Sequence, residues 1–179
     1  MKRRSATLWA ATLIAAAIAA PPAAASPPPP HQAVAAGDAF ARLSRLTGLW
    51  RPADKPDSPL RIRFYLTAGG TVLVESWEAA GKPHSLTLYH RDGEALLATH
   101  YCPQGNQPRL ALAGRDKDGL HFTYRDATDL DTATESHQHD LWLDLTDPER
   151  PVRGEIYSGK DGGGAQERLE LVRDSGGSE

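Results

Sequence analysis

The sequence predicts an all-β fold, a closed antiparallel up-and-down barrel of about ten strands with one short N-terminal helix. After Trp50, apolar and polar residues alternate in short runs, which is the period of a β-strand with one buried face. Turn-forming residues interrupt these runs about every ten positions. No connection is long enough to hold a crossover helix, so neighbouring strands should pair in sequence order and the sheet should close, which removes its exposed edges.

The expected turns contain Gly69-Gly70, Asp92-Gly93, Asp116 to Gly119, and Asp147-Pro148. The turn at Arg91 to Gly93 fits either a two-residue loop or a three-residue bulged loop. A two-sheet sandwich is the alternative architecture, but it usually needs longer crossing loops than this chain has. The ten strands expected between these turns are 48–53, 59–67, 71–78, 85–91, 94–102, 108–114, 119–125, 137–145, 152–158 and 165–173.

One helix is expected before the first strand, from Asp38 to Arg45, because Ala39, Phe40, Leu43 and Leu46 have helical spacing. Asp38 is the expected N-cap, and Gly48 is expected to end the helical segment.

The N-terminus has the pattern of a secretory signal peptide over residues 1–25. Three basic residues precede a small and apolar stretch that ends in Ala23-Ala24-Ala25, an A-x-A cleavage site. We expect residues 26–36 to form a Pro-rich linker, residues 37–174 the barrel domain, and residues 175–179 a disordered tail. We therefore expect an exported protein, periplasmic or secreted, by either the Sec or the twin-arginine route.

Charge and cysteine content exclude several classes of function. Loss of Lys2, Arg3 and Arg4 with the signal changes the formal net charge from −3 to −6, and no basic run remains for nucleic acid. The mature chain has no stretch that could span a membrane as a helix. Cys102 is alone, so no internal disulfide can form. Nothing in the sequence identifies a protein partner.

The segment Gly48-Leu49-Trp50 resembles the G-x-W motif of lipocalins and related calycin barrels. That resemblance implies that Gly48 and Trp50 are structural residues at the closed end of the barrel. It also implies that an arginine of the last strand packs on Trp50. Arg173 is the best positional match for this arginine, and Arg168 is the second.

A closer resemblance, over Val72 to His139, is to uncharacterised secreted lipocalin-like proteins of bacteria. It rests on Glu75-Ser76-Trp77, Tyr89 to Gly93, Thr99 to Cys102, Gly105 to Arg109, and His137-Gln138-His139. The strand count is similar to that of nitrobindin-like proteins, which bind haem. No histidine follows His139, where a proximal haem ligand would be sought, so haem is not expected.

Strand direction predicts which polar residues converge. Successive strands of a meander run in opposite directions, so strand ends sort onto two rims, with Trp50 and Arg173 at one and the open mouth at the other. His90 falls at the far end of its strand, away from the mouth. The residues predicted at or near the mouth, and hence to bind a ligand, are Glu75, His100, Cys102, Asn106, Gln107, Arg109, Tyr124, His137 and His139.

The period of two predicts which way these side chains face. His137 and His139 should continue the inward apolar face of Leu141, Leu143 and Leu145, while Gln138, Asp140 and Trp142 should face outward. By the same alternation, His100 and Cys102 share a face with Leu96 and Ala98.

Three functions remain open for this cluster. The first is a cup that binds a small, partly apolar ligand between apolar walls that include Phe122 and Tyr124. The second is a zinc or copper site formed by His100, Cys102, His137 and His139. The third, least favoured, is a hydrolase-type enzyme with Cys102, a histidine and Asn106, and we assign no catalytic residue. The cluster could also simply close the mouth through hydrogen bonds.

Overall fold

The computed structural model describes residues 35–116, 119–159 and 162–175. The predicted signal peptide, nearly all of the predicted linker and residues 176–179 of the predicted tail lie outside these residues. Among the described residues, no helix is both long and apolar enough to cross a membrane.

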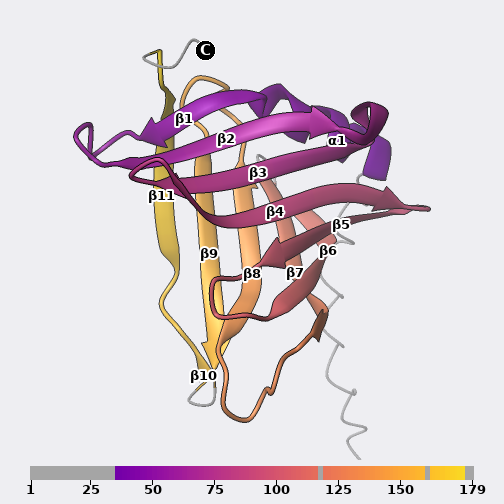
Figure 1. The fold of residues 1–179 in the computed structure, drawn as a ribbon. Helices are drawn as coiled ribbons and strands as arrows, with labels where there is room; N and C mark the ends of the chain where they lie inside the picture. Colours follow the sequence, from indigo (N-terminus) through magenta and orange to yellow (C-terminus); the bar gives the residue numbers. More distant parts are fainter. Residues whose placement is uncertain (1–34, 117–118, 160–161, 176–179) are drawn as a thin grey trace, which may run out of the picture. The chain divides into compact units, whose positions relative to one another are not determined.

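Eleven antiparallel strands form one sheet within the described residues, and ten of them close into a barrel (Figure 1). The predicted all-β barrel is confirmed. The strands are β1 (Gly48–Pro52), β2 (Leu60–Thr67), β3 (Val72–Ala79), β4 (Lys82–Asp92), β5 (Ala95–Tyr101), β6 (Gln107–Asp116), β7 (Gly119–Thr128), β8 (His137–Asp144), β9 (Val152–Gly159), β10 (Gly162–Gly163) and β11 (Glu167–Arg173).

Strands β1 to β9 pair in sequence order, each with the next one along the chain. β11 does not follow this order: it lies between β1 and β9 in the sheet. β11 pairs with β1 on one side and with β9 on the other, and this closes the barrel. The short β10 pairs only with the end of β9. Asp92 pairs with Ala95, so the turn that the sequence left open is the two-residue loop Gly93-Glu94.

The helix begins earlier than predicted. α1 spans Ala36–Leu43, and a 3₁₀ turn, η1, follows over Ser44–Leu46; a second 3₁₀ turn, η2, spans Ala68–Gly70. Ala35, which has no capping side chain, is the N-cap, so the prediction of Asp38 in that role was wrong. Asp38 instead lies in the first turn, where a carboxylate interacts favourably with the helix dipole.

Trp50 and Arg173 pack together at the end of the barrel where β1 begins. Arg173 is opposite Trp50 in the β1–β11 ladder, and its guanidinium carbon lies 4.4 Å from the centre of the Trp50 ring. Trp50 Nε1 donates to the carbonyl of Leu46 at 2.6 Å. Gly48 has a φ of 137°, and a Cβ there would lie 2.6 Å from Arg173 Nη1, so only glycine fits. The predicted Trp50–Arg173 packing is confirmed.

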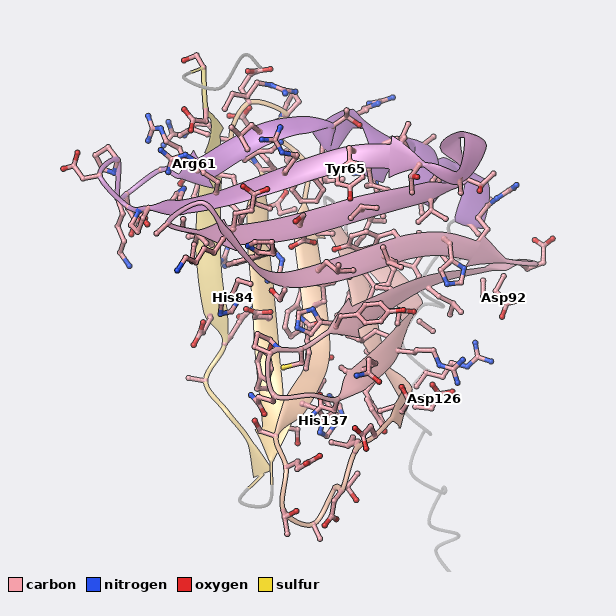
Figure 2. All side chains as sticks on the ribbon, viewed as in Figure 1. Arg61, Tyr65, His84, Asp92, Asp126 and His137 are labelled. Atoms are coloured by element: carbon pink, nitrogen blue, oxygen red, sulfur yellow. The ribbon has the colours of Figure 1, made fainter. Side chains whose placement is uncertain are left out.

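The barrel therefore has two different rims. We call the rim where β1 begins and β8 ends the α1 rim, because Ala36, Ala39 and Leu43 of α1 join the apolar core there. The opposite rim, where β5 ends and β8 begins, we call the mouth. Figure 2 shows His84 and His137 on the side of the barrel away from Asp92, which ends β4 at the α1 rim.

Candidate ligand site inside the barrel

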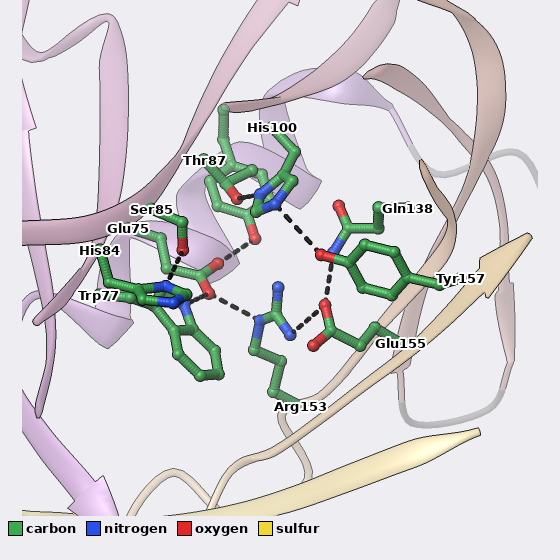
Figure 3. Close-up of polar contacts among 11 residues, drawn as sticks. Glu75, Trp77, His84, Ser85, Thr87, His100, Gln138, Arg153, Glu155 and Tyr157 are labelled. Carbon is green, nitrogen blue, oxygen red and sulfur yellow. Dashed lines mark hydrogen bonds and ion pairs between the residues drawn. The ribbon is translucent and has the colours of Figure 1, made fainter. Parts of the chain in front are cut away.

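The interior of the barrel contains a buried cluster of charged and polar side chains, which Figure 3 shows converging from several strands. We call it the Arg153 cluster. Six of its nine members are at most 3% exposed: Glu75, Thr87, Tyr89, His100, Gln138 and Arg153. The other three members are Trp77, Glu155 and Tyr157.

Arg153 is at the centre of the cluster. Its Nε lies 2.6 Å from Glu75 Oε1 on β3, and its Nη1 lies 2.9 Å from Glu155 Oε2, two residues along β9. Residues two apart on a strand share a face, so Arg153 and Glu155 both point inward. The guanidinium also lies over the Trp77 ring, 4.8 Å from its centre.

Glu75 is held by three neighbours. Trp77 Nε1 donates to Oε1 and the Tyr89 hydroxyl donates to Oε2, each at 2.5 Å. The carboxyl group is 0% exposed, although it lies in the middle of β3 rather than at the mouth. Two carboxyl groups thus share one guanidinium inside the barrel. Ions in such a place cost free energy that the mutual attraction barely offsets.

His100 completes the cluster as a neutral group at pH 7. Its Nδ1 is 3.0 Å from Thr87 Oγ1, and its Nε2 is 3.3 Å from the Tyr157 hydroxyl. Burial, helped by the nearby Arg153 charge, lowers the pKa of His100 to about 4. Both hydroxyl partners can donate or accept, so they suit a neutral imidazole, which has one donor and one acceptor.

Gln138 faces inward because β8 contains a bulge. Gln138 pairs with Tyr157 and Asp140 with Ile156, so His139 is an extra residue in the ladder. Gln138 Nε2 donates to Glu155 Oε2 at 2.6 Å, and the residue is 0% exposed. The prediction that Gln138 faces outward was therefore wrong. Strict alternation from Leu141 does not continue past the bulge.

Glu155 is ionised at neutral pH despite its burial. Burial alone would raise its pKa, but the Arg153 charge and hydrogen bonds from Arg153 and Gln138 lower it. Burial, followed by the Glu155 charge, raises the pKa of Tyr157, so that phenol stays protonated.

A second group of residues, the mouth cluster, lies where β8 begins. The Tyr124 ring is 4.7 Å from the His137 ring and 5.8 Å from the His139 ring. Asn106 is 1% exposed and donates to the Ser136 carbonyl at 3.0 Å. The Cys102 amide donates to the Asn106 carbonyl at 3.1 Å.

The structure brings together only part of the predicted site. Glu75 and His100 belong to the Arg153 cluster, whereas Cys102, Asn106, Tyr124, His137 and His139 lie at the mouth. As expected from the alternation, His100 is buried on the same face as Leu96 and Ala98.

Gln107 and Arg109 make exposed contacts outside both clusters. Arg109 pairs with Asp126, and Gln107 accepts a hydrogen bond from Thr128 at 2.7 Å. His139 is also accessible, with 44% of its side chain exposed and its Nδ1 2.8 Å from Asp140.

The geometry of the described residues does not support the metal and enzyme alternatives. Among residues 35–116, 119–159 and 162–175, no three His, Cys, Asp or Glu side chains are grouped to hold a metal ion. The predicted set of His100, Cys102, His137 and His139 is therefore not assembled. Both ring nitrogens of His100 face hydroxyl groups rather than the Cys102 thiol, so no nucleophile and base pair is formed there.

Three buried polar atoms lack a hydrogen-bond partner among the described residues near the mouth. They are Asn106 Oδ1, His137 Nδ1 and Gln138 Oε1. Arg153 Nε, although close to Glu75, also makes no well-directed hydrogen bond, so that contact is ionic. Native proteins rarely leave such atoms unpaired, and each costs about 1–3 kcal/mol.

Sequence reasoning missed Trp77, Thr87, Tyr89, Gln138, Arg153, Glu155 and Tyr157. The alternation of Arg153, Glu155 and Tyr157 along β9 is visible in the sequence, but a charged strand face is typical of the solvent side. Only pairing with β8, where Leu141 and Leu143 face inward opposite Glu155 and Arg153, shows that this face is internal.

No protein-family model matches the chain, and no curated protein is significantly similar to it.

Proposed function

We propose that this chain is an exported calycin-type barrel that binds a small, partly apolar ligand at its mouth, with the Arg153 cluster as the floor of the site. The observation that carries the proposal is the set of buried polar atoms without partners in Asn106, His137 and Gln138. A ligand that bonds to them would remove their desolvation cost.

The unpaired atoms indicate what the ligand must offer. Asn106 and Gln138 each use their amide nitrogen on an oxygen acceptor, Ser136 O and Glu155 Oε2, which leaves their oxygens to accept. The ligand should therefore carry at least one N–H or O–H donor. Its apolar part would contact the Tyr124 ring and Cys102.

The Arg153 cluster supports the proposal because its side chains are held in fixed positions and because the burial of their charges costs free energy. Every member makes a hydrogen bond or an ion pair with another member. A fold that needed only a core could fill these positions with apolar side chains at no loss of stability. Groups held in place before binding lose little entropy when a ligand arrives.

Native mass spectrometry of the protein isolated from its own host tests the proposal. We expect a chain that begins at Ser26, as the signal peptide predicts, with a small molecule bound to it. After removal of that molecule, the neutral dye N-phenyl-1-naphthylamine, which carries one N–H donor on an apolar frame, should bind saturably. His137→Leu should weaken dye binding by at least fivefold.

His90→Leu is the matched control, because His90 makes only an exposed contact with the Arg91 carbonyl on the far part of β4. It should leave the affinity for the dye within twofold of wild type. Absence of saturable binding, or equal losses in the two variants, would contradict a ligand site at the mouth. A retained metal ion would instead support the metal alternative.

A further inference from the structure

A pocket lies at the α1 rim, at the opposite end of the barrel from the mouth. It has a volume of about 320 Å³, within the range of small-molecule sites. Its lining comes from three separate segments: the α1–η1 segment, the connection between β8 and β9, and the end of β11. The residues that matter for the argument are Arg42, Arg45, Arg173, Leu46, Leu145 and Pro151.

The charged residues that line this pocket are all arginines. Arg42 lies near Asp144, whose pKa is lowered by a hydrogen bond from Thr146 and by nearby arginine charges. Among the described residues, neither Arg45 nor Arg173 is within ion-pair distance of a carboxylate. The pocket therefore has two positive charges that no described acidic group neutralises.

Arg173 is held in position before any ligand binds. It lies over the Trp50 ring at 4.4 Å and donates to the Thr47 carbonyl at 3.2 Å. These contacts leave other guanidinium N–H groups available, since the group has five donors. A planar guanidinium fixed in this way suits a carboxylate, sulfonate or phosphate.

The remaining lining is apolar. Leu46 is 3% exposed, and Leu145 packs against the apolar core. Pro151 adds a rigid wall at the start of β9. A simple inorganic anion would leave these surfaces without a partner, whereas an organic anion would cover them.

We propose that the pocket at the α1 rim binds a small organic anion, with its acidic group between Arg45 and Arg173 and its hydrocarbon part against Leu46, Leu145 and Pro151. This site is separate from the proposed site at the mouth and does not depend on it. It would let one barrel bind two ligands, one at each end.

Titration of ¹⁵N-labelled protein with octanoate, followed by NMR, tests the proposal. We expect saturable shifts for the amides of residues 42–46, of the non-proline residues in 145–152 and of residue 173. The dissociation constant should be at least tenfold lower than that of neutral 1-octanol. Arg45→Glu should weaken octanoate binding by at least tenfold. Arg45 is exposed, so its replacement should leave the fold intact.

Lys82→Glu is the matched control, since it makes the same change of charge at an exposed position of the mouth. It should leave the dissociation constant for octanoate within twofold of wild type. Equal affinities for octanoate and octanol, unchanged binding in Arg45→Glu, equal losses in both variants, or shifts confined to the mouth would each overturn the proposal. The amide spectrum of each variant shows directly that it is folded, and Arg45→Gln replaces Arg45→Glu if that variant is not.

Discussion

At the scale of single residues, the most unusual feature is Arg153, which is 3% exposed between two carboxyl groups. Buried ion pairs of this kind contribute little net stability, although removal of one partner typically costs about 3–5 kcal/mol. The Arg153 cluster is therefore better explained by a need for fixed polar groups inside the barrel than by a need for stability. His100 is likewise a polar group held in a fixed position, and its buried surroundings favour the neutral form of its ring.

The stability of the protein should depend on pH through His100. The pKa of His100 in the folded protein is about 4, below the usual value of 6.5. Above pH 6.5 the ring is neutral in both the folded and the unfolded chain, so its protonation takes nothing from the free energy of unfolding. As the pH falls from 6.5 to 4, the unfolded chain takes up a proton that the folded chain does not. The free energy of unfolding should then fall by up to about 3 kcal/mol.

Urea unfolding of wild type and His100→Gln between pH 4 and pH 7.5 measures this dependence. The variant should lose most of the decrease, while His90→Gln should retain it. His137, whose pKa is also lowered, by burial and then by His139, adds a smaller effect of the same sign in both proteins. Parallel curves for wild type and His100→Gln would show that His100 is not the group responsible.

At the scale of elements, the bulge in β8 decides which side chains face inward. One extra residue, His139, lies between Gln138 and Asp140 in the ladder with β9. The bulge keeps Gln138 against Glu155 and leaves His139 partly exposed beside Tyr124. Bulges of this kind often adjust side chains at binding sites.

Two single-residue deletions test the role of the bulge. Deletion of His139 should leave a regular ladder in which Gln138 still bonds to Glu155. Deletion of Gln138 gives a ladder of the same length but puts His139 opposite Tyr157, so Glu155 loses its amide donor. We expect the second variant to be less stable by about 1–3 kcal/mol in urea unfolding. Equal stability of the two would mean that the Gln138–Glu155 contact has no energetic weight.

At the scale of the whole molecule, closure by β11 joins the two halves of the sheet. β11 pairs with β1 on one side and with β9 on the other, so loss of this strand would open the barrel and expose two strand edges. The closed barrel has two opposite rims. The arginine-lined pocket lies at the α1 rim and shares no lining residue with the Arg153 cluster inside the barrel.

Substitutions on the two faces of β11 should differ strongly in their effect on the stability of the protein. Leu171 is 1% exposed in the core, so Leu171→Asp buries an unpaired charge and should abolish cooperative thermal unfolding, as followed by circular dichroism. Val172 faces the other way and is opposite Arg51, so Val172→Asp should change the free energy of unfolding by less than about 1 kcal/mol. Cooperative unfolding of Leu171→Asp would contradict the role of β11 as the closing strand.

The sequence alone determined the strands, their order and the closed barrel. These features depend on local alternation, turn residues and strand direction, all of which are written along the chain. The packing of Arg173 on Trp50 was implied by the resemblance of Gly48-Leu49-Trp50 to the lipocalin motif. The sequence also indicated that His100 is buried. It did not indicate the Arg153 cluster, the inward position of Gln138 or the pocket at the α1 rim. Those depend on a bulge and on pairing between distant strands, which alternation within one strand cannot reveal, because a charged face has the same period whether it meets water or another charge.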